Sequence, residues 1–362
     1  MKLRRNTDKA GVLLLVLVLL GAAALGLGWW RHAAFATVPL AGIETGDTLL
    51  VARGDSLPRV VARLQEEGVR TGPLLQWRLL ARQLDADGRL QVGEYALTPG
   101  ATPQSLLLAM RDGKVVRRGF TIVEGWNIRD LRAALAKVEG LRHDGEKLDD
   151  AALMKALGHA GQHPEGRFLP ETYAWVRGDS DLDILGRAHD AMQKALDAAW
   201  ASRAPDLPLQ SKDEALTLAS IVEKETGIAE ERPQIAGLFA RRLKIGMRLQ
   251  TDPTVIYGMG AAYAGNIRRS DLTTDTPYNT YTRAGLPPTP IAMPGKAALQ
   301  AVAHPAEGDA LYFVAVGDGS GRHVFSKSLD QHNSAVRDYV QRYRAQQRDS
   351  QQQTPQKTAT PK

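Results

Sequence analysis

The hydrophobic pattern begins with one long apolar run and continues as shorter segments of helical or strand-like spacing. Residues 10–30 carry no charged side chain, and a run of that length crosses a bilayer core as a single helix. Basic residues in the preceding tail, 1–9, and Trp29-Trp30 at the far end predict a single-pass anchor with a cytoplasmic N-terminus. A cleavable signal peptide is the alternative, because small residues such as Ala22 could precede a cleavage site. Both interpretations export the remainder of the chain.

Residues 32–43 are expected to form a short juxtamembrane connection, and residues 44–116 then have the pattern of a small module. Its predicted elements are a strand at 48–51, helices at 57–67 and 73–84, a strand at 91–97 and a third helix starting at Thr102-Pro103. This order, with the turn Gly54-Asp55-Ser56-Leu57, resembles a LysM module, a small fold that binds glycans containing N-acetylglucosamine. A purely structural spacer is the alternative. Ser56 is not expected to act as a nucleophile, because no histidine partner accompanies it.

Residues 117–345 mix strand and helix patterns, which predicts a larger α+β domain. Helical spacing covers 128–141, 151–157, 183–202, 211–225 and 235–243, whereas 311–316 and 323–326 alternate as a hairpin around a glycine-rich turn. The pair Arg232-Pro233 is expected to break the chain between the helices at 211–225 and 235–243. A final helix starts at the capping sequence Ser328-Leu329-Asp330-Gln331. Residues 346–362 are rich in Gln, Thr, Pro and Lys and are expected to be disordered.

Composition excludes several function classes. The chain has 362 residues, 43% of them hydrophobic, which is enough for two or three domains with real cores. It contains no cysteine, so disulfides, thiol nucleophiles and thiolate metal sites are absent. The net charge of +6 is spread along the chain without a dense basic block, so no nucleic-acid partner is expected. His304, His323 and His332 lack the close pairing of a zinc motif, and no metal or cofactor is predicted.

Candidate chemistry lies at the end of an apolar helix. Ser211 and Glu214 have the spacing of a capping box, which starts a helix there. Leu216, Ala219 and Glu223 then fall on one helical face. A carboxyl group at the end of an apolar stripe is partly desolvated, which raises its pKa toward the value that a general acid needs near neutral pH. Glu223 is therefore the candidate catalytic acid.

A second glutamate follows closely. Glu225 lies about 200° further round the helix, so the two carboxyl groups cannot both enter one cleft. The alternative interpretation is that Glu223-Lys224-Glu225 is an ordinary solvated charge cluster near a helix end.

Two stretches of the C-terminal half hold aromatic and amide groups suited to a sugar groove. Gln250 lies on the approach to a helix for which Asp252 is the expected N-cap. Tyr278 and Asn279 lie in a long irregular segment. Ring faces stack on pyranose C–H surfaces and amides bind hydroxyl groups, although turn formation alone is the alternative explanation.

Several long motifs occur in a fixed order. They are Ile221-Val222-Glu223-Lys224-Glu225-Thr226, Arg248-Leu249-Gln250-Thr251-Asp252-Pro253-Thr254-Val255-Ile256-Tyr257-Gly258, Tyr278-Asn279-Thr280-Tyr281 and the hairpin with His323 and Phe325. Together they resemble the YceG-like family of endolytic murein transglycosylases, from the N-terminal run to about Arg344. One departure is Thr289, where glycine is expected in many relatives, and it concerns only local loop geometry.

The resemblance implies cleavage of the β-1,4 bond between N-acetylmuramic acid and N-acetylglucosamine within a peptidoglycan strand. The sugar's own 6-hydroxyl would replace water as the nucleophile and leave a 1,6-anhydro end. The family's catalytic glutamate corresponds to Glu223, which would protonate the leaving oxygen and then accept the proton of the 6-hydroxyl. The candidate substrate contacts are Gln250, Asp252, Tyr278, Asn279 and Glu225, the last of which is expected to orient the helix or bind a neighbouring cation.

Two other functions stay open. A muramidase would hydrolyse the same bond, with Asp252 or Glu171 as a second acid. A non-catalytic anchor would bind glycan through the LysM-like module and recruit synthases. By resemblance, the expected partners are peptidoglycan strands and penicillin-binding synthases of the elongation or division machinery, and the expected location is the inner membrane with the catalytic domain outside the cytoplasm.

Overall fold

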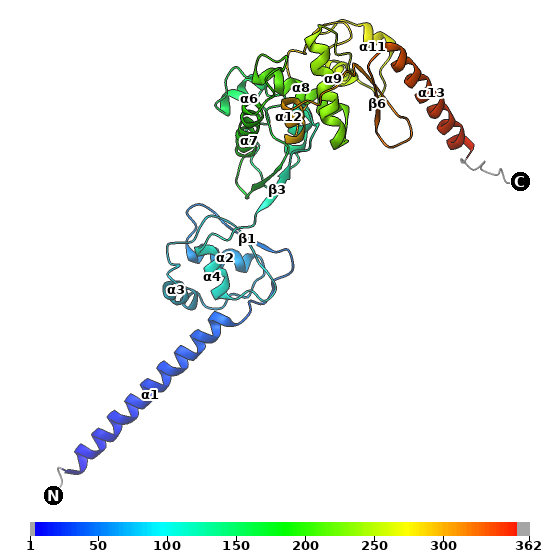
Figure 1. Cartoon of the computed structure of the whole chain (residues 1–362). Coiled ribbons are helices and arrows are strands. Elements are labelled where there is room, and N and C mark those ends of the chain that lie inside the picture. The colour runs from blue at the N-terminus through cyan, green and yellow to red at the C-terminus, as the bar shows by residue number, and fades with distance from the viewer. Residues whose placement is uncertain (1–3, 353–362) are drawn as a thin grey trace, which may run out of the picture. The chain divides into compact units, whose positions relative to one another are not determined.

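The computed structural model describes residues 4–352, which fall into two compact units (Figure 1). The first unit combines Met1–Arg118 with Trp175–Gly178, and the second combines Gly119–Ala174 with Asp179–Lys362. Each unit contains helices and a short antiparallel strand pair. The predicted α+β class is therefore confirmed.

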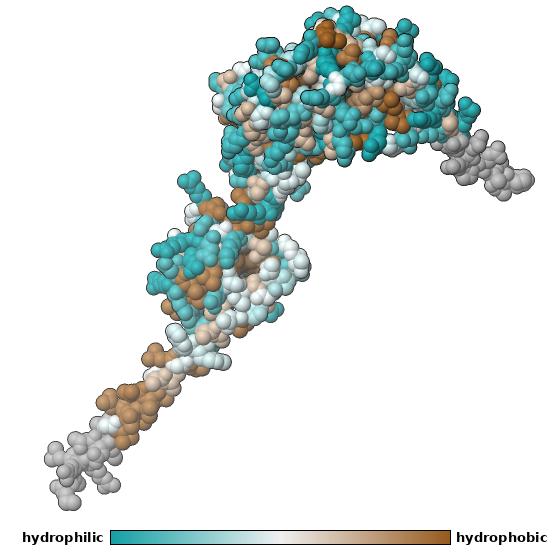
Figure 2. Space-filling view, in the orientation of Figure 1, coloured by the Kyte–Doolittle hydropathy of each residue, from teal (hydrophilic) through white to brown (hydrophobic). Residues whose placement is uncertain are grey.

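Helix α1 (Arg4–Thr37) contains the apolar run. Its part from Gly11 to Thr37 is long and apolar enough to cross a membrane. Hydrophobic side chains are exposed along this helix, as Figure 2 shows. An exposed apolar helix is unfavourable in water, which agrees with the predicted anchor.

The end of α1 belongs to the core of the first unit. Residues 32–43 were expected to form a connection, but α1 continues to Thr37, and Ala36 and Leu40 are buried. Phe35 packs edge-on against Trp77, with ring centroids 5.6 Å apart. The apolar helix and the first unit are therefore joined by packed side chains rather than by a loose linker.

The first unit has the predicted strand, helix, helix, strand order. Its elements are β1 (Thr48–Val51), α2 (Leu57–Glu66), α3 (Leu74–Gln83), β2 (Gly93–Ala96) and α4 (Pro103–Arg111). β1 and β2 pair antiparallel, with Thr48 opposite Ala96. Thr102 caps α4 as expected, because its hydroxyl accepts the Ser105 N–H at 3.1 Å. The likeness to a LysM module stays a prediction.

Helix α8 (Lys212–Glu225) is central to the second unit, where it packs with α7 (Asp181–Ala201), α9 (Arg232–Lys244) and α12 (Lys296–Ala303) (Figure 1). All residues from 215 to 222 are buried, so this helix is covered on every side. Ser211 accepts the Glu214 N–H at 3.2 Å, as a capping residue should. The reciprocal bond differs from the prediction, because the Glu214 carboxylate accepts the Gln210 N–H instead.

The remaining elements position loops around this core. They are β3 (Arg118–Thr121), which pairs with β4 (Thr172–Trp175), and α5 (Ile128–Leu135), α6 (Asp150–Ala156), α10 (Asp252–Met259), α11 (Arg269–Thr273), β5 (Tyr312–Ala315), β6 (His323–Ser326) and α13 (Leu329–Gln352). The predicted hairpin is present, with Phe313 opposite Phe325.

Four local predictions need correction. Helix α5 ends at Leu135, six residues before the expected end, because a non-helical turn follows. Thr251, not Asp252, is the N-cap of α10. Arg232-Pro233 starts α9 instead of ending a helix, because proline is tolerated in a first turn. The expected disorder from residue 346 is also wrong in part, since α13 continues to Gln352, and residues 353–362 lie outside the described part of the chain.

Candidate active site

Helix α8 ends with two glutamates whose carboxyl groups have different partners. Glu223 and Glu225 are separated by about 200° around the helix axis. They contact different loops, so the second unit contains two acidic sites rather than one paired site.

The Glu223 carboxyl is held among charged groups. Its side chain is 5% exposed, Oε2 accepts the Gly295 N–H at 2.9 Å, and Oε1 lies 3.7 Å from the Arg232 guanidinium. Burial raises the pKa of Glu223, and the negative charge of Glu124 raises it further, against the opposing effects of Gly295, Arg232 and Lys224. The raised pKa has the direction predicted from the sequence.

Glu124 completes this site from the loop before α5. A Cβ atom added at Gly295 would lie 2.0 Å from Glu124 Oε1, so only glycine allows the carboxylate this close to the chain. The residue after Gly295, Lys296, pairs with Glu171 at 2.8 Å, and both side chains line a groove of about 550 Å³ between α7 and α12.

Glu225 lines a separate pocket of about 380 Å³. Burial raises the pKa of Glu225 to about 7, and the negative charge of Asp252 adds to this shift. Two groups oppose it: the Thr251 hydroxyl, which donates a hydrogen bond to Oε1, and the positive charge of Arg242. A carboxyl group with a pKa near 7 exists in both protonation states at neutral pH. It can therefore donate a proton and take one back within one reaction cycle.

A strained turn positions the pocket floor. Gln250 has a φ of +49°, one of two positive values for non-glycine residues in the described part of the chain. The turn is held by buried threonines: the Thr251 N–H donates to Thr280 Oγ1 at 3.1 Å, and the Thr254 and Thr280 hydroxyls lie 2.9 Å apart. Strain of this kind persists only where the surroundings impose it, and here it directs Thr251 at Glu225.

Polar groups cover the rest of the pocket. The Tyr281 hydroxyl donates to Asp252 Oδ1 at 2.6 Å. Arg242 is 5% exposed; it donates to the Leu311 carbonyl at 2.7 Å and lies over the Tyr312 ring, 5.5 Å from its centroid. A fixed buried cation beside Glu225 stabilises the carboxylate that remains after a proton has been given away.

The structure brings three of the sequence-based candidates together and separates the other three. Glu225, Gln250 and Asp252 line the same pocket, whereas Glu223, Tyr278 and Asn279 do not line it. Tyr278 packs on Tyr257, and its hydroxyl lies 2.9 Å from that of Thr289, the position that departs from the family pattern.

Asn279 has a structural role. It is fully buried, and its amide nitrogen donates to the carbonyls of Asp271, Leu272 and Thr274 while its oxygen accepts the Tyr281 N–H. An amide whose bonding groups are all used inside the chain has none to offer a sugar, so we correct its expected role from groove contact to loop support.

Sequence reasoning overlooked Arg242 and Tyr281. A usable signal for Arg242 was present, because it follows Ile235, Leu238 and Phe239 at helical spacing and thus falls on the buried face of α9. A charge on such a face is rare without a partner. For Tyr281, the only signal in the sequence was its place in the motif Tyr278-Asn279-Thr280-Tyr281.

The histidines considered from the sequence lie apart. His323 Nδ1 bonds to Glu231 at 2.7 Å, His304 lies 3.2 Å from the Ser202 hydroxyl, and His332 stacks on Tyr312 in the Glu225 pocket.

Glu165 is a further buried acid, and it gives a prediction for stability. It is fully buried, both oxygens accept the Ile128 N–H at 3.1 Å, and the Tyr257 hydroxyl donates to it at 3.0 Å. Burial raises its pKa from 4.5 to about 7. The folded state therefore binds this proton more tightly than the unfolded state. The contribution of this proton to the free energy of unfolding is complete below pH 4.5. It is lost as pH rises to about 7, which lowers the free energy of unfolding by about 3 kcal/mol.

We expect Glu165→Gln to remove this part of the pH dependence, because the amide oxygen still accepts hydrogen bonds but carries no charge. Urea unfolding of the full chain at pH 5 and pH 8 measures it. Glu225 also makes the free energy of unfolding fall with rising pH, so the change in this free energy between the two pH values is compared between wild type and variant. Glu139→Gln, which changes an exposed glutamate, is the matched control. An unchanged difference between the two pH values in Glu165→Gln would contradict the prediction.

Taken together, the fold and the sites define a mixed α+β protein with an N-terminal apolar helix, whose larger unit carries buried acids at the end of its central helix. The chain belongs to the YceG-like family, whose model matches residues 49–338.

Named relatives were found in two species. The endolytic murein transglycosylase of Bacillus subtilis is 32% identical, over 69% of this chain and 73% of that protein. The endolytic murein transglycosylase of Streptococcus pneumoniae is 25% identical over 69% of this chain, and the match spans about half of that protein, 51%. A crystal structure of a YceG-like protein from Listeria monocytogenes aligns with a TM-score of 0.49 and 28% identity, covering 80% of this chain and 98% of that one.

Proposed function

We propose that this protein is an endolytic peptidoglycan lytic transglycosylase. Membership of the YceG-like family and two relatives that are named endolytic murein transglycosylases support this activity. The structural observation that carries the chemistry is a buried carboxyl with a pKa near 7 in a polar pocket. The substrate is a glycan strand in which N-acetylmuramic acid and N-acetylglucosamine alternate.

The acid is one of the two glutamates of α8. Glu225 is supported by its pocket, by a pKa of about 7 and by the nearby Arg242 and Thr251. Glu223, which the sequence motif favours, is supported by its raised pKa and by the Gly295 N–H and the Arg232 guanidinium beside its carboxyl group. Geometry favours Glu225, because a substrate oxygen must reach the carboxyl and this pocket provides the space.

The reaction needs one carboxyl group. Protonated Glu225 gives its proton to the glycosidic oxygen as the bond from C1 breaks, and the carboxylate is then stabilised by the Thr251 hydroxyl and by Arg242. The carboxylate next accepts the proton of the 6-hydroxyl as this oxygen bonds to C1. The acid is restored, no water is consumed, and the product ends in a 1,6-anhydro sugar. The N-acetyl group of the substrate can stabilise the positive charge at C1.

The product distinguishes this reaction from hydrolysis. We expect digestion of purified peptidoglycan strands with the full chain to give fragments whose new ends are lighter by one water than reducing ends, and mass spectrometry measures this. Reducing ends alone would show a muramidase, for which Asp252 beside Glu225 would serve as the second acid. Intact strands would leave a glycan-binding scaffold as the function.

Helix α1 supports a proposal for the position in the cell. We propose that α1 anchors the protein in the inner membrane with its N-terminus inside the cytoplasm, so that the chain after α1 lies outside it. The end of α1 packs against the module proposed at residues 44–116, and it therefore holds this module close to the membrane surface. An enzyme attached there meets strands as synthases release them, and we propose that it terminates their elongation beside penicillin-binding synthases. Glycan binding by the first unit is proposed on the LysM-like order of its elements.

A further inference from the structure

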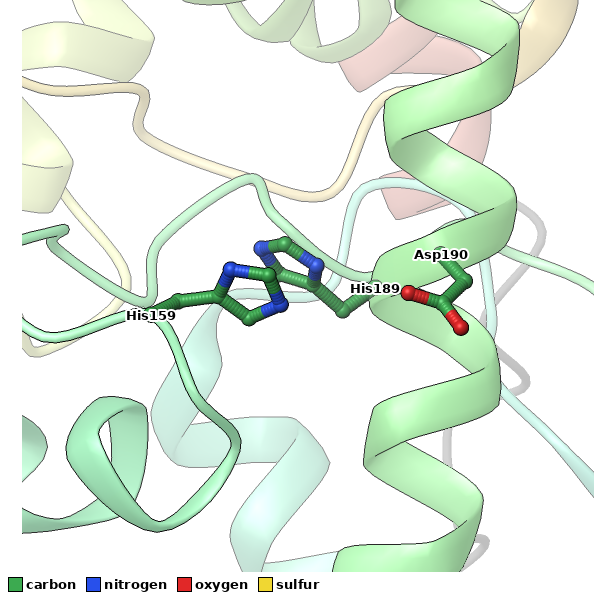
Figure 3. A group of neighbouring side chains, drawn as sticks. All are labelled: His159, His189 and Asp190. Carbon is green, nitrogen blue, oxygen red and sulfur yellow. The ribbon is translucent and has the colours of Figure 1, made fainter.

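Three side chains of the second unit form a group that the cleavage reaction does not use. His159 follows α6 in a loop, and His189 and Asp190 are neighbours on α7 (Figure 3). One nitrogen of each histidine and one oxygen of Asp190 lie within 4.8 Å of one another. The two imidazole rings lie face to face, with centroids 3.6 Å apart.

His189 has the properties of a metal ligand before any metal binds. It is 2% exposed, and a buried imidazole favours the neutral form, which is the form that binds metals. Its Nε2 lies 3.2 Å from Gln162 Oε1. An amide oxygen only accepts hydrogen bonds, so the ring proton is on Nε2 and the lone pair is on Nδ1.

Nδ1 of His189 is buried and has no hydrogen-bond partner within the described residues. A buried acceptor without a partner is unfavourable, which calls for an explanation in a folded protein. The bond from Nε2–H to an amide oxygen is the outer contact that orients histidines bound to metals. If Nδ1 binds a cation, both nitrogens of the His189 ring have a partner: Gln162 for Nε2 and the ion for Nδ1.

The other two groups are free to approach the same point. No hydrogen bond or ion pair among residues 4–352 holds the His159 ring or the Asp190 carboxylate. His159 is half-buried and Asp190 is exposed, so an ion can enter from solvent. Bonds of about 2.0–2.2 Å to zinc require the three ligand atoms to draw closer than they lie here, which rotation of the His159 ring and the Asp190 side chain supplies.

We propose that His159, His189 and Asp190 form a binding site for a divalent transition-metal ion such as zinc. Two imidazoles and one carboxylate suit zinc, cobalt or iron(II) and leave further positions for water. The ion would fasten the loop after α6 to α7, and Gln162 would act as a positioning residue through His189. The loop continues to Glu165, which bonds to Tyr257, and to Glu171, which pairs with Lys296, so the ion would also support this segment without touching Glu223 or Glu225. This inference does not depend on the proposed cleavage.

The test is direct metal binding to the full chain, purified in detergent without a polyhistidine tag and stripped with a chelator. We expect calorimetric titration with ZnCl₂ to show one saturable site per chain, CoCl₂ to give a ligand-field absorption band, and zinc to raise the melting temperature. His159→Gln and Asp190→Asn should each weaken binding at least tenfold, and Gln162→Ala should weaken it about 10–100-fold while all three ligands remain.

His304→Gln, which removes an exposed histidine of the same unit, is the matched control and should bind zinc like wild type. Asp190 is exposed, so Asp190→Asn should fold normally, and equal melting temperatures of the metal-free proteins check this. Binding by wild type with a loss only in the three site variants supports the proposal. Absence of saturable binding by wild type, or wild-type affinity in His159→Gln and Asp190→Asn, would overturn it.

Discussion

Replacing Glu225 by glutamine should reduce strand cleavage by about 10²–10⁴-fold, the usual contribution of a positioned general acid. The amide can still accept the Thr251 hydrogen bond, so the pocket should keep its shape, but it has no proton to donate. Release of anhydro-ended fragments from purified strands, measured as an initial rate by chromatography and mass spectrometry, gives the effect. Thermal unfolding of the same sample checks that the variant is folded.

Glu223→Gln is the matched comparison, since it lies two residues away on the same helix and retains an oxygen for the Gly295 N–H. If Glu225 is the acid, Glu223→Gln should retain most of the activity. The opposite pattern, with cleavage lost only in Glu223→Gln, would establish the residue that the sequence motif indicated. Full activity in both variants would exclude α8 as the source of the acid.

Cleavage by the wild-type enzyme should decline about tenfold for each pH unit above about 7, because the reaction starts from protonated Glu225 and its pKa is about 7. The negative charge of Asp252 helps to raise that pKa. Asp252→Asn removes the charge but keeps an oxygen for the Tyr281 hydroxyl, so the midpoint should move to lower pH. The profile of kcat/KM against pH measures both effects.

Asp206→Asn, which changes an exposed carboxylate, serves as the control for a general loss of negative charge and should leave the midpoint in place. An activity that is independent of pH between 6 and 9, or a midpoint that Asp252→Asn leaves unmoved, would show that the acid is not Glu225.

The order of elements could be predicted well because it depends on local patterns. Strand β1 at Thr48–Val51 and the cap at Thr102 follow from spacing and turn chemistry within a few residues. The end of α5 was less accurate, because a helix ends where its neighbours stop supporting it. The packed end of α1 was missed for the same reason: residues 32–43 are short of apolar periodicity, and their burial depends on α3, a distant segment of the chain.

Individual site residues show the limit of sequence reasoning more clearly. A polar residue in a motif can support a loop or face a pocket, and only the contacts distinguish these roles. Asn279 and Asp252 looked equivalent as groove candidates, yet the amide of Asn279 is used up by backbone carbonyls while Asp252 lines the pocket with Glu225. The burial of Glu225 likewise requires α9 and the turn at Gln250, which no periodicity in α8 reveals.

The sequence by itself determined the apolar anchor segment, the α+β class, the family and the helix that carries the acids, because hydrophobic period, caps and ordered motifs are local properties of the chain. Only the tertiary structure decided the surroundings of each acid: Arg232 and Gly295 at Glu223, a pocket with Arg242 at Glu225, and the meeting of His159 with His189. The physical reason is that desolvation and charge, which set a pKa or a ligand site, come from segments far apart in the chain that meet only after folding.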